Sequence, residues 1–165
     1  MQLIIDSGST KCDWVYLSED TSVSFETMGL NPLYHTAEKI EAVVQENQAL
    51  YALRDFVSSI HFYGAGCATE SLKSVVEEGL KRVFSNAKIQ IESDLMATIY
   101  TTFRGEPAIS CILGTGSNAC YFAGTTIQPH VPPPCDILTD DRSGAQFGKD
   151  LSNPFLSTRL PESME

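Results

Sequence analysis

The sequence predicts an α/β fold: a mixed sheet with flanking helices, followed by the truncated start of a second, similar domain. Two observations predict it. Apolar runs suited to β-strands alternate with segments of helical periodicity, in the order βββ-α-β-α-β-α before residue 105. In addition, Ile5–Thr10 matches Leu113–Asn118 position by position, at an offset of 108 residues from Gly8 to Gly116. Both segments are Gly/Ser/Thr turns between apolar strands, and such a repeat indicates two related half-domains.

The elements of the first half follow from the spacing of its apolar residues. Thr36 is a suitable N-cap for a helix from about Ala37, whose end is blurred by Glu46–Gln48. In chain order, the expected strands are Met1–Asp6, Lys11–Ser18, Val23–Met28, Ser59–Tyr63 and Lys88–Glu92, and the expected helices begin near Ala37, Glu70 and Ser93.

The connection Arg104–Pro107 separates the two halves, so we expect domains at residues 1–104 and 105–165. The second half begins with a hairpin, continues through a proline-rich loop and ends in a helical pattern. Pro154 interrupts that pattern, which predicts a helix that ends or kinks near Ser152. Residues 105–165 are too few to repeat the layout of the first half, so the second domain is expected to be an incomplete start.

The composition is that of a globular protein, with 42% hydrophobic and 19% charged residues. A formal net charge of −10 argues against nucleic acid or an anionic membrane as a partner, because both require a basic face. The five cysteines form no CxxC pair, which favours buried reduced thiols, and the three histidines lack the spacing of a zinc site. The N-terminus has no signal peptide or membrane span, so a cytoplasmic location is expected.

The two glycine-containing turns are candidate phosphate sites, because backbone N–H groups on a concave turn attract anions. Asp6 ends the first strand beside the Gly8 turn. There its carboxylate could hold a hydrated Mg²⁺ or only cap the turn, and the residues alone leave both interpretations open. Lys11 flanks the same turn, where it could reach a phosphate or lie solvated at the strand edge.

Asn31 and Asp94 also have two interpretations each. Asn31 follows Gly29-Leu30, where a turn residue is favoured over a hydrogen bond to a ligand. Asp94 opens a helix and could be a simple N-cap. If the preceding strand ends at a cleft, Asp94 is instead a carboxylate at a helix N-terminus that could accept a proton from a substrate hydroxyl.

Five motifs lie in order along nearly the whole chain: Asp6–Trp14, Asn31-Pro32, Phe62–Cys67, Ser93-Asp94 and Ile112–Asn118. Together they resemble the N-terminal part of the BadF/BadG/BcrA/BcrD-type ATPase family, close to the N-acetylglucosamine kinases. That family belongs to the superfamily of actin, hexokinase and Hsp70. The resemblance therefore implies a ribonuclease H-like, actin-like ATPase domain.

The resemblance also implies an ATP-dependent phosphotransferase acting on an amino sugar, with ATP and Mg²⁺ as cofactors. Asp6 would face Mg²⁺ and Asp94 would be the general base. Asn31, Asn118 and Asp140 would contact the sugar. The residues expected to bind the nucleotide are Ser7, Gly8, Ser9, Thr10, Lys11, Gly114, Thr115, Gly116 and Ser117.

The chain departs from the family in the loop that reads Gly-Asp-Glu-Gly-Ser-Gly there and Thr139–Gly144 here, with Arg142 in place of a glycine. Family chains also continue well beyond this length. Two other functions stay open: a non-catalytic nucleotide- or sugar-binding module, and an ATPase that activates a redox partner protein. Activators of the second kind use a cysteine-bound iron–sulfur cluster, and the cysteines here lack suggestive spacing. A homodimer is left open as well.

Overall fold

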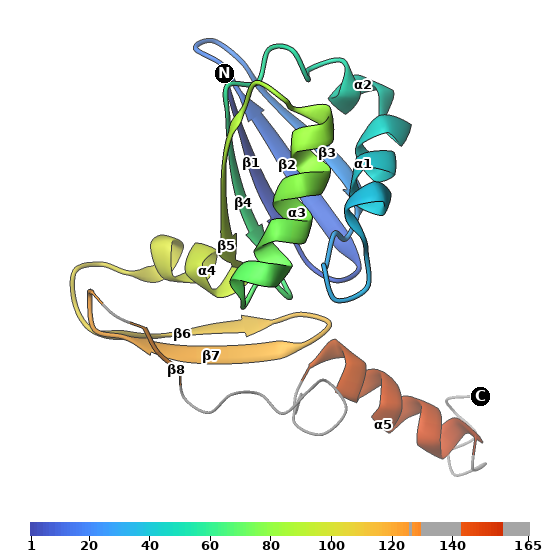
Figure 1. The fold of residues 1–165 in the computed structure, drawn as a ribbon. Coiled ribbons are helices and arrows are strands. Elements are labelled where there is room, and N and C mark those ends of the chain that lie inside the picture. Colours follow the sequence, from blue (N-terminus) through green and yellow to red (C-terminus); the bar gives the residue numbers. More distant parts are fainter. Residues whose placement is uncertain (126, 130–142, 157–165) are drawn as a thin grey trace. The chain divides into compact units, whose positions relative to one another are not determined.

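The structure, a computed structural model, describes residues 1–125, 127–129 and 143–156. The chain divides into two compact units, Met1–Tyr100 and Thr101–Glu165 (Figure 1). No helix among the described residues is both long enough and apolar enough to cross a membrane.

The first unit is built on a five-stranded sheet, as the alternation of strands and helices predicts. The strands are β1 (Gln2–Ser7), β2 (Lys11–Leu17), β3 (Ser22–Met28), β4 (Ser59–Gly64) and β5 (Lys88–Ser93). Their order in the sheet is β3-β2-β1-β4-β5. The first three strands are antiparallel, whereas β4 and β5 run parallel to β1. The expected mixed sheet is therefore confirmed.

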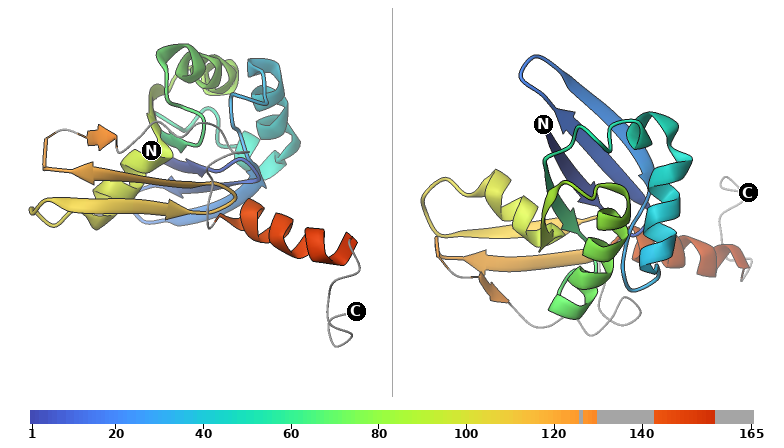
Figure 2. Two further views of the ribbon diagram at one scale, coloured as in Figure 1. Left: turned by 90° about the horizontal axis from the view of Figure 1, so that it is seen from below. Right: turned by 45° about the horizontal axis from the view of Figure 1, so that its top comes forward.

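Helices cover one face of this sheet. They are α1 (Ala37–Glu46), the single-turn α2 (Gln48–Tyr51) and α3 (Glu70–Val83), and α4 (Asp94–Thr102) follows β5. Figure 2 shows α1 and α3 side by side over the same face. Every second residue of β1 and β2 points into the core beneath them, including the fully buried Leu3, Ile5 and Trp14. Thr36 is the N-cap of α1, as predicted, and its hydroxyl accepts from the backbone N–H of Lys39.

The second unit contains a smaller antiparallel sheet of β6 (Ala108–Leu113), β7 (Ser117–Phe122) and β8 (Ile127–Pro129), followed by α5 (Gly144–Leu156). The rings of Phe103 and Phe122 pack edge to face, with their centroids 5.0 Å apart. The expected end of the last helix near Ser152 is wrong. The helix passes through Pro154 and stops two residues later, so the missing proline N–H leaves one carbonyl near the C-terminus, that of Asp150, without its helical donor.

The two hairpins that carry the repeated turns differ in register. In the first, Ser7 pairs with Cys12 and four residues lie between them. In the second, Leu113 pairs with Ser117 and three residues lie between them. Gly8 is therefore the first residue of its turn, whereas Gly116 is the last residue of its own. The predicted position-by-position match is wrong in register, because turns of unequal length cannot align residue by residue.

Candidate functional site

Three parallel strands of the first unit, β1, β4 and β5, end at one edge of the sheet. In register, Asp6 lies opposite Tyr63, and Tyr63 lies opposite Glu92. Asp94 comes two residues after Glu92. Neighbouring strands are ~4.8 Å apart, so the backbones of β1 and β5 are separated by roughly 10 Å at this edge. The carboxyl ends of parallel strands are where α/β proteins bind ligands. The fold thus brings Asp6 and Asp94 to the same edge.

Asp6 lies on the sheet face opposite the core, next to further acidic groups. Its pKa is raised from the ordinary value, first by the loss of water around the carboxyl group and second by the charge of Asp13. Asp13 lies opposite Asp6 on β2 and forms an ion pair of 3.0 Å with Lys11. The Lys11 ammonium also contacts Glu26 at 3.0 Å. Lys11 is exposed and held by two carboxylates, which matches the interpretation as a solvated strand-edge lysine.

Asp94 is the first residue of α4 and is half-buried. Its Oδ1 accepts from the backbone N–H of Leu95 at 2.8 Å. Burial raises the pKa of this carboxyl. The Leu95 hydrogen bond lowers the pKa, and the charge of Asp6 raises it further. Asp94 therefore accepts a hydrogen bond at a helix N-terminus, and its pKa is also affected by the charge of Asp6 at the end of a nearby strand.

The first glycine turn is held closely by the segment that follows β3. The backbone N–H of Gly8 donates to the carbonyl of Lys11 at 2.9 Å, which closes the turn. The buried Ser7 hydroxyl accepts from the Leu30 N–H at 2.8 Å. Ser7 thus supports the turn with its side chain instead of presenting it to solvent. In the part of the chain that the structure describes, the backbone N–H of Ser9 has no hydrogen-bond acceptor, so it remains available to an anion.

Gly29 and Asn31 complete the support of this turn. The Gly29 N–H donates to the Thr10 carbonyl at 3.0 Å. A Cβ at position 29 would lie 2.3 Å from the Gly8 carbonyl oxygen, so only glycine permits this close approach. Asn31 is buried, and its side-chain amide donates to the Ser9 hydroxyl at 2.9 Å. Asn31, predicted as a sugar contact, is therefore bonded to the predicted phosphate turn.

The second glycine turn lies in the other unit and contacts the start of α5. Within the turn, the Gly114 N–H donates to the Gly116 carbonyl at 2.8 Å. The Gly144 N–H donates to the Gly114 carbonyl at 2.8 Å, and the Ala145 N–H donates to the Thr115 carbonyl at 3.2 Å. The beginning of this helix thus fixes the position of two turn carbonyls.

Sequence reasoning missed this role of the α5 N-terminus. The buried Ser143 is its cap, with a hydroxyl that accepts from the Gln146 N–H at 3.1 Å. The signal was present, since a serine followed three residues later by glutamine is the pattern of a capping box.

Of the two remaining predicted sugar contacts, the structure describes one. Asn118 is exposed on β7, directly after the second turn, and its Oδ1 accepts from the Ala119 N–H at 2.8 Å. Asp140 lies outside the described residues.

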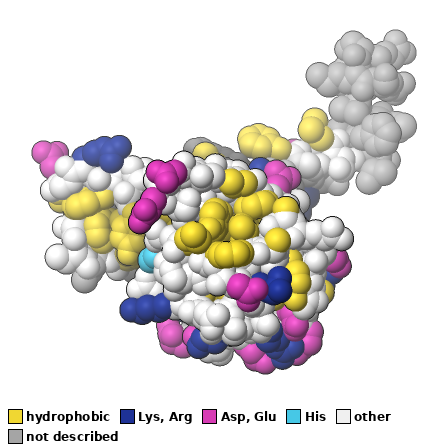
Figure 3. All heavy atoms as spheres, turned by 90° about the horizontal axis from the view of Figure 1, so that it is seen from above, with side chains coloured by type: hydrophobic (Ala, Val, Ile, Leu, Met, Phe, Trp, Pro, Cys, Tyr) yellow, Lys and Arg dark blue, Asp and Glu magenta, His cyan; other side chains and the backbone are white. Residues whose placement is uncertain are grey.

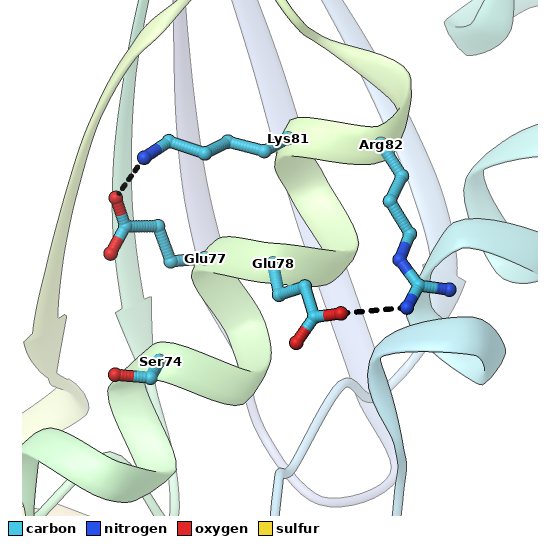
Figure 4. A pocket seen from close by; sticks show the side chains of 5 residues that line it. All are labelled: Ser74, Glu77, Glu78, Lys81 and Arg82. Atoms are coloured by element: carbon cyan, nitrogen blue, oxygen red, sulfur yellow. Dashed lines mark hydrogen bonds and ion pairs between the residues drawn. The ribbon is translucent and has the colours of Figure 1, made fainter.

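Two other surface features do not resemble a substrate site. A shallow hollow of about 440 Å³ is lined by five side chains of α3 alone (Figure 4). Its charges already pair within the helix, Lys81 with Glu77 at 2.6 Å and Arg82 with Glu78 at 2.7 Å. At the opposite end of the first unit, where β1 and β4 begin, Figure 3 shows gathered hydrophobic side chains, which suit neither a phosphate nor a sugar.

A metal ion held by the protein needs several side-chain donors that converge on one point. Among the described residues, no group of three or more His, Cys, Asp or Glu side chains converges on a common point. The described residues therefore hold no cluster of the kind that binds a structural zinc ion through three or four such side chains. Mg²⁺ differs, because it takes only one or two carboxylates and fills its remaining positions with water and substrate phosphates.

No protein-family model and no curated protein matches the chain. Among solved structures, it is similar to a Porphyromonas gingivalis protein described as a candidate N-acetylglucosamine kinase, with 34% identity and a TM-score of 0.85. The match covers 98% of this chain and 58% of that one, so this chain spans little more than half the length of that protein.

Two further structures show a much weaker likeness. YeaZ from Pseudomonas aeruginosa has 15% identity and a TM-score of 0.42, over 82% of this chain and 72% of its own. The PPX-GPPA enzyme of Aquifex aeolicus has 12% identity and a TM-score of 0.38, over 77% of this chain and 50% of its own. Similarity at this level says nothing about the chemistry of this chain.

Proposed function

We propose that the chain is the nucleotide- and sugar-binding portion of an ATP-dependent kinase of an amino sugar, of the BadF/BadG/BcrA/BcrD type. One observation carries the proposal. The chain shares 34% of its residues and its fold with a candidate N-acetylglucosamine kinase over 98% of its length. The positions of Asp6 and Asp94 support it, because phosphoryl transfer needs carboxylates at one ligand-binding edge for the metal and for the attacking hydroxyl.

The residues at this edge fit Mg²⁺ bound to ATP. Asp6 is a single carboxylate on an exposed sheet face, beside Asp13, whose charge raises the pKa of Asp6. A divalent cation there would relieve the repulsion, with water and phosphate oxygens as its other ligands. When bound, Mg²⁺·ATP supplies the phosphoryl group. The turns at Gly8–Thr10 and Gly114–Ser117 are proposed to position its phosphates through backbone N–H groups.

Asp94 is proposed to orient the sugar hydroxyl and to accept its proton. A carboxylate whose pKa is raised by burial holds a proton better than a solvated one, and a late proton transfer demands little basicity. Asn118 and Asp140 are proposed sugar contacts. Asn31 was predicted as a third, although both ends of its side-chain amide are already bonded within the protein.

The test is sugar-dependent release of ADP, followed in a coupled assay with N-acetylglucosamine and with no sugar. Because this chain spans 58% of the matched kinase, the assay should use the whole polypeptide that the gene encodes. Phosphorylated sugar and ADP in equal amounts would support the proposal. ADP binding without sugar-dependent turnover would overturn it in favour of a non-catalytic binding module.

A further inference from the structure

We propose that Asn31 is a positioning residue for the nucleotide: it acts through Ser9, holding the first turn in shape, and does not act by contacting the sugar. The part that concerns the nucleotide rests on the proposed kinase function. The part that concerns the turn rests on the hydrogen bonds alone.

The orientation of the Asn31 amide is fixed by its neighbours. The backbone N–H of Leu33 donates to Oδ1 at 2.9 Å. Because a backbone N–H can only donate, the oxygen must be on that side and the NH₂ group must face the other way. The NH₂ group donates to the Ser9 Oγ at 2.9 Å. With 4% of its surface exposed, the Asn31 side chain has little area left for a substrate.

A second loop also contacts the Asn31 side chain, at Gly66. The residue has φ of +82°, and a Cβ there would lie 2.1 Å from Asn31 Oδ1. Any other side chain would therefore push the Asn31 amide aside. Asn31 thus connects three loops, namely the β1–β2 turn at Ser9, its own loop after β3, and the β4–α3 loop at Gly66.

The consequence for ligand binding follows from the neighbouring bonds. Ser9 is the turn residue whose backbone N–H has no acceptor among the described residues, and its side chain is the one that Asn31 holds. The same loop bonds the turn on both sides, through Gly29 to Thr10 and through Leu30 to Ser7. A fixed N–H binds an anion better than one that must first be ordered, so the loss of Asn31 is expected to weaken nucleotide binding.

The experiment is a double-mutant cycle on the whole polypeptide that the gene encodes, with Asn31→Ala, Ser9→Ala and the double variant, titrated with Mg²⁺·ADP in a calorimeter. One lost hydrogen bond corresponds to about 3- to 10-fold in affinity. Each single variant is expected to weaken ADP binding by that factor. The double variant should lose no more ADP affinity than the single variant that binds ADP less tightly. The affinity for N-acetylglucosamine should not change in Asn31→Ala.

Amide hydrogen exchange gives a readout that does not depend on any ligand. The N–H groups of Gly8 and Gly29 are both bonded across the turn, so both should exchange faster in Asn31→Ala. Asn31→Asp should retain their protection, because its second carboxylate oxygen can accept from the Ser9 hydroxyl. Asn47→Ala is the matched control: it removes an asparagine that caps α2, and it should alter neither ADP binding nor these two amides.

The outcomes separate this inference from the proposed function. If Asn31→Ala weakens sugar binding alone, or if the two single effects on ADP binding add fully, the inference is wrong. If the unsubstituted chain binds no ADP, the nucleotide site is wrong, and the exchange of Gly8 and Gly29 then decides whether Asn31 holds the turn. If Asn31→Ala does not fold, Ser9→Ala breaks the same bond from a less buried residue and must show the same loss of protection.

Discussion

The carboxylates of Asp6 and Asp94 lie at the ends of two strands separated only by β4, and the negative charge of Asp6 raises the pKa of Asp94. Asp13 acts on Asp6 in the same direction. Negative charges that raise the pKa of a neighbouring carboxyl group, as Asp13 does for Asp6 and Asp6 does for Asp94, are costly in a folded protein. Perturbed carboxylates at a strand edge are typical of sites that bind a cation or move a proton.

The first prediction concerns Asp94 in the whole encoded protein. Asp94→Asn keeps an oxygen that can accept from the Leu95 N–H but cannot take a proton from a sugar hydroxyl. We expect the rate of sugar phosphorylation to fall about 10²- to 10⁴-fold, with the affinities for sugar and nucleotide nearly unchanged. Steady-state kinetics and calorimetry measure the two effects separately.

Glu92→Gln is the matched control for this variant. Glu92 is a carboxylate at the same strand ends, and it contacts Lys73 at 3.9 Å. Its loss should leave the phosphorylation rate within a few-fold of the unsubstituted protein. If Asp94→Asn is as active as Glu92→Gln, then Asp94 is only a helix cap.

A second prediction concerns stability and pH. The raised pKa means that the folded state binds the Asp94 proton more tightly than the unfolded state does. The stabilisation by this proton is fully present below the ordinary value of 3.8 and is lost as the pH rises through the folded value. At pH 7, ionised Asp94 therefore destabilises the first unit, and Asp94→Asn should raise its Tm. The difference should shrink as the pH approaches 4.

Trp14 makes this measurement specific, because it is the only tryptophan and is fully buried in the core of the first unit. Its fluorescence on heating reports the unfolding of that unit. Asp20→Asn, in the exposed turn between β2 and β3, serves as the control and should leave the Tm unchanged at each pH. A Tm of Asp94→Asn that is equal to or below that of the unsubstituted chain at pH 7 would contradict the prediction.

Much of the first unit could be predicted from local sequence. The alternation of Leu3, Ile5 and Ser7 defines the buried face of β1, and the hydroxyl of Thr36 defines the start of α1. The break between α1 and α2 could not be located, because Asn47 both ends one helix and caps the next within an apolar pattern that continues to Tyr51. The path of α5 through Pro154 was also missed, since a proline near a helix end disrupts a single hydrogen bond.

The candidate site was predicted less completely, because its contacts join residues far apart in the sequence. The carboxylates Asp6 and Asp94 could be proposed from strand ends and a helix start. The bond between Asn31 and Ser9 could not, because it spans 22 positions and depends on the approach of Gly66 from a third loop. The unequal lengths of the two glycine-containing turns could not be predicted either, because the matching Gly, Ser and Thr residues do not show where the flanking strands pair.

The third prediction tests the contact between Gly66 and Asn31. Gly66→Ala places a side chain at a positive φ and displaces the Asn31 amide, so both backbone strain and lost hydrogen bonds destabilise the fold. We expect a loss of about 2–4 kcal/mol in the free energy of unfolding, measured by urea titration of Trp14 fluorescence.

The double variant Gly66→Ala/Asn31→Ala distinguishes this contact from strain alone. If Gly66→Ala already breaks the bonds of Asn31, the second substitution should remove little further stability. Full addition of the two single effects would show that the Asn31 amide remains in place when position 66 carries a methyl group, and the contact would then be unimportant.

The last prediction is that the second unit opens more easily than the first. In its described part, Cys120 is the one hydrophobic side chain of the small sheet that is buried, while Ile109 and Leu113 of β6 are 71% and 74% exposed. Three short strands with so little apolar burial are marginally stable. Amide exchange of β6 and β7 should therefore be on the order of 100-fold faster than that of β1 and β4. The measurement requires a chain shown by light scattering to be monomeric, because a partner copy could protect these strands. Equal protection of the two sheets in a monomer would overturn the prediction.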